Sequence, residues 1–176
     1  MATETIPRIK EVRTVQLIDG SLGAYAAGDV VGADDCCTTL AIPWIFLEVA
    51  RGNGMGGYIT GAIIVNETEN QAVQYDLFLF NATPTGEKRD NAANTNPLKT
   101  DRSKYIGKIA FPSTVEKGAT VATYTQATPS TVGNLPMPFK CATADDALYG
   151  ILVTNTAYTQ DVGTDDIEIT LLVEQA

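Results

Sequence analysis

The chain has 176 residues, of which 44% are hydrophobic and 19% charged; this is the composition of a globular domain and excludes a disordered chain. A chain of this length buries roughly 70% of the surface that its unfolded form exposes, so it can fold without a disulfide or a metal ion. The formal net charge of −9 disfavours nucleic acid as a partner, because phosphate backbones carry charge of the same sign. Histidine is absent, which excludes Ser-His-Asp and Cys-His catalysis and removes the commonest zinc ligand.

The first residues of the chain are polar and contain Pro7, a composition that favours a flexible arm. We therefore expect a flexible N-terminal arm over residues 1–12 and one β-sandwich domain over residues 13–176. The alternation that starts at residue 9 also fits a first strand, so both interpretations of residues 1–12 stay open. We expect no secretion signal, because a basic segment followed by an apolar core is missing, and no apolar run is long enough to span a membrane.

Short runs rich in β-branched and aromatic residues predict strands along the whole chain. In chain order these are residues 9–17, 39–47, 58–65, 73–80, 105–111, 120–124, 139–141, 148–154 and 167–174. In residues 58–65 we expect Ile59, Ile63 and Val65 to share one face. Residues 73–80 become apolar on both faces, which predicts a central strand that is covered on both sides.

The last predicted strand has the clearest alternation, with Ile167, Ile169, Leu171 and Val173 on one face and mainly polar residues on the other. Turn residues separate the strands: Asp19-Gly20, Gly28-Asp29, Gly52-Asn53-Gly54, Lys117-Gly118, Gly133-Asn134 and Gly163-Thr164. Residues 90–104 are expected to form a long surface loop with room for one short helical turn. The pattern predicts an all-β fold: an antiparallel, jelly-roll-like β-sandwich of about eight or nine short strands with little helix.

The three cysteines, Cys36, Cys37 and Cys141, are an odd number and lack the spacing of a zinc site. Two adjacent cysteines on a strand point to opposite faces. We therefore expect at least two free thiols in a reducing compartment and no disulfide framework.

Gly52, Gly54 and Gly57 match the G-x-G-x-x-G pattern of dinucleotide-binding loops. That pattern requires a helix after the loop, and here a predicted strand follows, so we interpret the segment as a glycine-rich loop that joins strands.

Acidic pairs occur at Asp34-Asp35, Asp145-Asp146 and Asp165-Asp166. Two carboxylates held roughly 5–10 Å apart could hydrolyse a glycoside, but adjacent aspartates between small residues usually cap turns, which is the interpretation that we favour. Asp161, Asp165 and Asp166 around Gly163 could form a weak calcium-binding loop, but they lack the spacing of an EF-hand. The sequence therefore predicts no catalytic, cofactor-binding or metal-binding residues, and we do not expect an enzyme.

Three passages carry a resemblance to a known class of protein. They are Tyr-Ala-Ala-Gly-Asp-Val-Val-Gly at 25–32, Leu-Phe-Leu-Phe-Asn-Ala-Thr-Pro-Thr at 77–85 with Asp90-Asn91 after it, and Leu-Tyr-Gly-Ile-Leu-Val-Thr at 148–154 with Ala-Tyr-Thr at 157–159. In order and spacing they resemble the capsid decoration proteins of tailed bacteriophages, also called cement or head auxiliary proteins. The resemblance extends over residues 12–175.

The resemblance implies a structural virion protein that is made in the host cytoplasm and lies on the exterior of the capsid. Such a protein binds the outer surface of the phage capsid and stabilises it by bridging major capsid subunits. The implied partners are the major capsid protein and further copies of the chain in a homotrimer, without nucleic acid or a membrane. The alternative is a carbohydrate- or host-receptor-binding β-sandwich module of a phage fibre, in which Trp44, Tyr58 or Tyr105 would stack on sugars.

Overall fold

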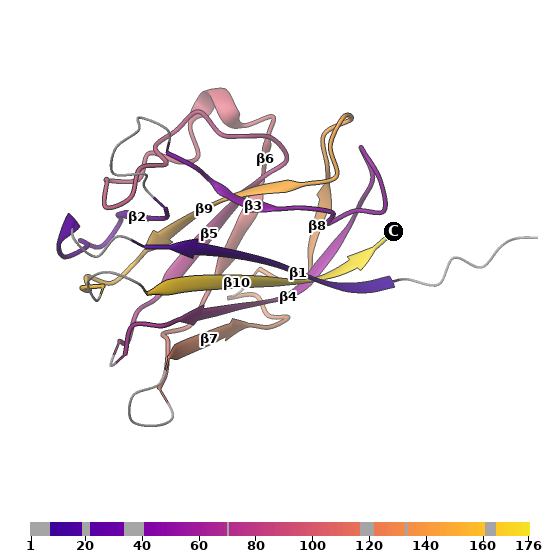
Figure 1. Cartoon of the computed structure of the whole chain (residues 1–176). Helices are drawn as coiled ribbons and strands as arrows, with labels where there is room; N and C mark the ends of the chain where they lie inside the picture. The colour runs from indigo at the N-terminus through magenta and orange to yellow at the C-terminus, as the bar shows by residue number, and fades with distance from the viewer. Residues whose placement is uncertain are drawn as a thin grey trace, which may run out of the picture.

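The computed structural model describes residues 8–18, 22–33, 41–69, 71–116, 122–132, 134–160 and 165–176, and these residues form an all-β structure of two antiparallel sheets (Figure 1). The strands are β1 (Arg8–Leu17), β2 (Val30–Val31), β3 (Trp44–Phe46), β4 (Gly56–Asn66), β5 (Tyr75–Phe80), β6 (Tyr105–Ala110), β7 (Thr123–Ala127), β8 (Met137–Lys140), β9 (Leu148–Thr154) and β10 (Asp166–Gln175). A 3₁₀ turn, η2 (Lys99–Asp101), lies between β5 and β6. The predicted all-β sandwich with little helix is confirmed.

The strand order is that of a jelly roll. Sheet 1 has the order β1-β10-β4-β7 with β8 also paired to β4, and sheet 2 has the order β2-β9-β5-β6 with β3 also paired to β9. β7 and β8 pair with successive parts of β4, and β2 and β3 pair with successive parts of β9, so each couple forms one interrupted edge strand. The result is two four-stranded sheets whose long crossing connections give the jelly-roll topology.

Strand predictions were accurate where the alternation is regular. β9 coincides with predicted residues 148–154, and β10 extends the predicted strand by one residue at each end. β1 begins at Arg8, so residues 8–12 belong to the sheet, whereas residues 1–7 lie outside the described part of the chain.

Two predicted strands were misplaced, for physical reasons. Of the described residues 41–47 within the predicted strand 39–47, β3 takes Trp44–Phe46, because Pro43 cannot donate a backbone hydrogen bond and Glu48 has a positive φ of 55°. β7 runs from Thr123 to Ala127 and so continues three residues beyond the predicted end at residue 124, whereas residues 120 and 121 lie outside the described part of the chain. Thr123 and Thr125 point inward and are buried although they are polar. The alternation of apolar and polar residues therefore does not identify the inward face of this strand.

The core lies between the two sheets and is built from the alternating residues of each strand. On β10 it takes Ile167, Ile169, Leu171 and Val173, the inward face that the sequence predicted. The largest fully buried side chains include Trp44, Phe46, Tyr25 and Tyr75. These residues form one continuous cluster between the sheets.

A second, smaller apolar cluster lies on the outer side of sheet 2, formed by Val30, Phe80, Ile151 and Val153. These residues are buried although they point away from the core. We attribute their burial to the connection between β5 and β6, residues 81–104, which starts at Phe80 and hydrogen-bonds through Asn91 and Ala92 to the backbone of Val30. The prediction that residues 73–80 contain a central strand covered on both sides is confirmed, because β5 lies between β9 and β6 and is buried on both faces at its end.

Buried aspartates hold this connection in place. The Asp101 carboxylate accepts hydrogen bonds from the Thr85 backbone N–H (2.7 Å) and hydroxyl (2.8 Å) and forms an ion pair with Lys104 at 2.9 Å. Burial opposes its charge, but these hydrogen bonds and Lys104 lower the pKa of Asp101 overall. Asp90 accepts hydrogen bonds from the Tyr25 hydroxyl and the Gly32 backbone N–H. Asp90 therefore fixes the start of the predicted surface loop to residues 25 and 32, and Asp101 fixes its end to Thr85 within the same connection.

Three tyrosines meet at one end of the core. Tyr25 stacks on Tyr158 with ring centroids 4.8 Å apart, and Tyr75 meets Tyr158 edge to face. Burial is the main cause that raises the pKa of Tyr75 to about 12 and the pKa of Tyr158 well above 10. Within the described residues the Tyr158 hydroxyl, which is buried, has no hydrogen-bond partner of ordinary geometry.

These raised pKa values predict a loss of stability in alkali. Tyrosine in the unfolded chain ionises near pH 10, whereas Tyr158 stays neutral in the folded protein. The contribution of the neutral Tyr158 side chain to the free energy of unfolding is therefore complete below about pH 9. Above about pH 10 the free energy of unfolding falls by about 1.4 kcal/mol per pH unit. Tyr158→Phe is expected to leave the free energy of unfolding at pH 7 nearly unchanged and to flatten the decline between about pH 10 and 12.

Urea unfolding followed by fluorescence at pH 7 and at several alkaline pH values measures both effects. Tyr58→Phe, at an exposed position, is the matched control and should keep the profile of the unsubstituted chain. An alkaline decline that is equally steep in Tyr158→Phe would refute this account of the cluster.

Candidate interaction surface

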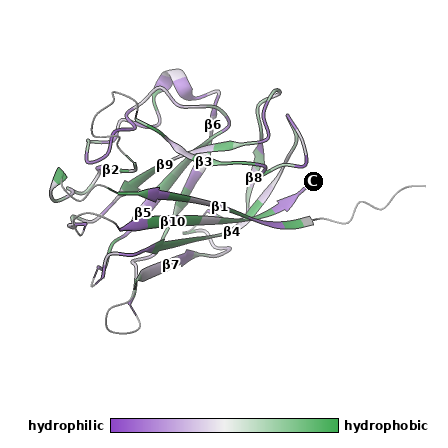
Figure 2. Ribbon diagram, viewed as in Figure 1, coloured by the Kyte–Doolittle hydropathy of each residue, from purple (hydrophilic) through white to green (hydrophobic). Residues whose placement is uncertain are grey.

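The outer face of sheet 1 carries apolar side chains directed into solvent, and we call it the open face. Its apolar members are Ile9, Val15 and Leu17 of β1, Tyr58, Ile63 and Val65 of β4, Tyr124 of β7 and Leu172 of β10. Five of them have large exposed fractions: Ile9 76%, Leu17 53%, Val15 50%, Tyr58 50% and Tyr124 41%. Ile63, Val65 and Leu172 are half-buried. Figure 2 shows hydrophobic stretches along the strands of this sheet and a largely hydrophilic connection beside sheet 2.

The strand register brings these side chains into neighbouring rows. Val15 of β1 lies opposite Glu168 of β10, which lies opposite Val65 of β4, and Val65 lies opposite Tyr124 of β7. At the other end of the sheet Glu174 lies between Ile9 and Tyr58. Side chains directly opposite one another on one face of a sheet are in contact range, so Val65 and Tyr124 form an apolar pair, while Glu168 and Glu174 lie between the apolar residues of β1 and those of β4.

A β-bulge in β4 creates much of this surface. Gly61 pairs with Leu172, but Ile59 pairs with the next residue, Val173, so Thr60 is an extra residue on β4. The bulge reverses the alternation of the strand. Ile59 therefore points into the core and is fully buried, whereas Ile63 and Val65 point outward. The prediction that Ile59, Ile63 and Val65 share one face was wrong for this reason.

Close backbone packing at the start of β4 requires glycine. A Cβ atom at Gly57 would collide with the carbonyl oxygen of Glu174, and one at Gly56 would collide with that of Phe139. The glycines at 52 and 54 lie in the turn that leads into the strand β4. The prediction that a strand, and not a helix, follows this glycine-rich loop is confirmed.

Charged side chains on the open face are few and lie mainly on β1 and β10. Glu11 and Arg13 form an exposed ion pair at 2.9 Å along β1. On β10, Glu168 accepts a hydrogen bond of 3.3 Å from the Thr170 hydroxyl. Ile63 lies opposite the uncharged Thr170 and Gln126, whereas Val65 lies opposite Glu168 and Leu172 lies opposite Glu11, so apolar and charged side chains alternate across the face.

The three aromatic residues considered for stacking on sugars differ in exposure. Trp44 is 1% exposed, and its indole N–H donates a hydrogen bond of 2.9 Å to the carbonyl of Val31, so it is a core residue. Tyr105 packs against Phe80 and Phe78 in the cluster outside sheet 2. Of the three, Tyr58 alone is exposed, and it belongs to the open face.

The acidic pairs within the described residues have structural roles. Asp145 accepts hydrogen bonds from the Ala147 backbone N–H and from the Tyr149 hydroxyl, at 3.1 and 2.6 Å, as a turn-capping residue does. Asp165 accepts a hydrogen bond from the Thr68 hydroxyl, and Asp166 begins β10. Asp34, Asp35 and Asp161 lie outside the described residues, and no group of metal-ligating side chains occurs within them.

Cys141 is a free, buried thiol. Burial, followed by the charges of Asp145 and Asp146, raises its pKa to about 11, so the thiol is protonated at neutral pH and is a poor nucleophile. Cys36 and Cys37 lie outside the described residues.

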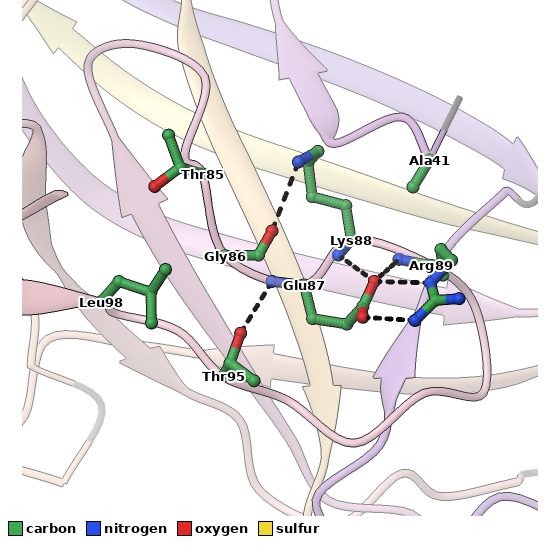
Figure 3. A pocket seen from close by; sticks show the side chains of 8 residues that line it. All are labelled: Ala41, Thr85, Gly86, Glu87, Lys88, Arg89, Thr95 and Leu98. Atoms are coloured by element: carbon green, nitrogen blue, oxygen red, sulfur yellow. Dashed lines mark hydrogen bonds and ion pairs between the residues drawn. The ribbon is translucent and has the colours of Figure 1, made fainter. Parts of the chain in front are cut away.

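A surface pocket of about 540 Å³ lies in the connection between β5 and β6 (Figure 3). Its lining residues are Ala41, Thr85, Gly86, Glu87, Lys88, Arg89, Thr95 and Leu98. The side chain of Arg89 holds the Glu87 carboxylate at 2.8 Å and is the main cause that lowers the pKa of Glu87 to about 2. A carboxylate that is ionised at neutral pH cannot act as a general acid. Lys88 donates to the carbonyl oxygens of Pro84 and Gly86, so these charges stabilise the loop.

The fold and the open face together define a jelly-roll domain that presents an apolar sheet face to solvent. No protein-family model matches the chain, and no curated protein matches its sequence. Within the described residues, no helix is long and apolar enough to cross a membrane.

The apolar residues of the open face are expected to contribute little to folding. Val15→Ser and Tyr124→Ser should change the free energy of unfolding by about 0.5 kcal/mol or less, because exposed side chains lose little buried area on substitution. Ile64→Ala, one residue from Ile63 but inside the core, should cost about 2–5 kcal/mol. Denaturant unfolding of the three variants measures the difference; a large loss for Val15→Ser would show that the face is covered within one chain.

Proposed function

We propose that this chain is a structural virion protein that binds the outer surface of a tailed-phage capsid through its open face. In this proposal it stabilises the particle by bridging neighbouring major capsid subunits. The observation that carries the proposal is the asymmetry between the sheets: the apolar cluster outside sheet 2 is buried, whereas Ile9, Val15 and Leu17 on sheet 1 are exposed. Exposed apolar side chains gathered on one sheet face, interspersed with a few charged ones, are typical of a protein-binding site.

The sheet structure of the molecule supports a role in bridging neighbouring capsid subunits. A face built on hydrogen-bonded strands can lie across the junction of two subunits with its backbone already ordered, so little conformational entropy is lost on binding. Many copies on one particle add their contacts through multivalency, which resists the outward pressure of packed DNA. The net charge of −9 suits the exterior of the capsid better than its DNA-facing interior.

The proposal includes the partners that the resemblance over residues 12–175 implies. They are the major capsid protein and further copies of the chain as a homotrimer, with no nucleic acid and no membrane. Assembly takes place after synthesis in the host cytoplasm, and the final location is the capsid exterior. The carbohydrate-binding alternative is weaker, because Trp44 is in the core and Tyr105 packs in the cluster outside sheet 2.

Binding to capsids tests the proposal directly. Purified protein is mixed with expanded, decoration-free heads that are assembled from the major capsid protein of the genome that encodes this chain. Cosedimentation should show saturable binding with a fixed number of copies per head. Ile63→Lys, on the open face opposite the uncharged Thr170 and Gln126, should weaken binding about tenfold or more, because it buries an unpaired charge in the interface.

Val132→Lys is the matched control, because it introduces the same charge at an exposed valine outside sheet 1. It should bind as well as the unsubstituted chain. Absence of binding to any form of the capsid would remove the proposal, and equal losses for the two lysine variants would remove the open face as the binding site.

A further inference from the structure

We propose that β1 pairs in antiparallel register with β1 of a second copy of this chain, centred on Val12. The pairing joins sheet 1 of the two copies into one continuous sheet around a two-fold axis. It uses the edge of the sheet and not its open face, so it does not depend on the proposed capsid binding. Because each copy has one β1 edge, the pairing closes as a dimer and takes the place of the homotrimer that the resemblance implies; the mass of the assembly distinguishes the two.

Within the part of the chain that the structure describes, β1 is a long edge strand that pairs with a strand on one side alone. It lies at the end of the order β1-β10-β4-β7, and all ten of its residues pair with β10. Among the described residues no other strand forms backbone hydrogen bonds with β1. An edge of this length presents a row of backbone donors and acceptors to a further strand.

The strand is held rigidly in the position that pairing requires. Lys10 forms hydrogen bonds with the Glu48 carboxylate and backbone carbonyl, at 2.8 and 3.0 Å. Gln16 bonds to the Pro43 carbonyl and accepts a bond from the Ala33 N–H. These contacts fix both halves of β1 to segments beside sheet 2, so a second strand meets an ordered template.

The opposite edge of sheet 1 is not suited to pairing. It is divided between β7 and β8, with no strand from Ala127 to Met137, and β8 contains Pro138. Proline and interruption are two means by which proteins prevent strand addition at an edge. β1 has neither, because its ten residues are continuous and contain no proline.

The order of charges on β1 selects one register. When Val12 faces Val12 of the second copy, Glu11 faces Arg13, Arg13 faces Glu11, and both pairs are complementary. In the same register Ile9 faces Val15 on the open side, which continues the apolar surface across the axis. A shift of the partner strand that centres the axis on Glu11 or on Arg13 places like charges opposite each other.

Both charged residues are available for these contacts. The side chains of Arg13 and Glu11 are 60% and 58% exposed, and their ion pair runs along a single strand. In the paired form the two ion pairs lie side by side in opposite orientation, which gives a square of alternating charges. Each opposite-charge contact across strands stabilises the pair, and two arise per dimer by symmetry.

Charge reversal tests the pairing. Analytical ultracentrifugation at low ionic strength should show a dimer that dissociates on dilution. Arg13→Glu should raise the dissociation constant about tenfold or more, because both contacts become Glu–Glu, and Glu11→Arg should do the same. Reversal of both residues in one chain restores complementarity and should restore the dimer. Arg102→Glu, at an exposed residue after η2, is the control and should dimerise normally.

A mixture of the two single variants gives the sharpest result. Each alone is impaired, but one carries two acidic and the other two basic residues, so together they should form a heterodimer as tight as the original dimer. Circular dichroism of each variant checks that the fold is retained. A chain that is monomeric at every concentration overturns the pairing, as does an assembly whose mass is the same in Arg13→Glu. Either result leaves capsid binding by the open face standing, because that is measured separately on heads.

Discussion

A sandwich has four sheet faces, and in this chain all four carry apolar side chains. The two inner faces cover each other and form the core around Trp44 and Phe46. The outer face of sheet 2 is covered by the connection 81–104, which buried aspartates such as Asp101 fix in place. The outer face of sheet 1 has no comparable connection among the described residues. Because apolar area in water is unfavourable, this remaining face is the feature from which the proposed function follows.

The sequence predicted the fold class and most strand positions because antiparallel strands with one covered face show strict alternation. β10 is the best case: its four inward residues were identified from the sequence alone. The open face was missed because one bulge at Thr60 reverses the alternation within β4. A period-2 pattern contains no signal for an extra residue, so Ile63 and Val65 were placed on the same face as Ile59. Their outward position follows only from the pairing with β10.

Buried polar residues account for the error at β7. Thr123 and Thr125 occupy inward positions of β7 because their hydroxyls donate hydrogen bonds to the carbonyls of Asn66 and Pro112. Such bonds offset the cost of burying a polar group, but they depend on partners distant in sequence. At Trp44 the local pattern and the structure agree. The residue lies in an apolar run and is buried, and its indole N–H donates a hydrogen bond to the carbonyl of Val31. The sequence pattern therefore predicts whether a side chain points inward only where inward residues are apolar and outward residues are polar.

The edge and the face of sheet 1 are geometrically independent binding directions. Backbone groups of β1 point in the plane of the sheet, whereas Ile9, Val15 and Leu17 point perpendicular to it. A second copy at the edge would therefore leave the face accessible and would double its area in one plane. A doubled face spans more of an underlying shell than one copy does, and two weak contacts held in a fixed relation bind more tightly than two free ones. Edge pairing would in this way increase the effect of a modest apolar patch.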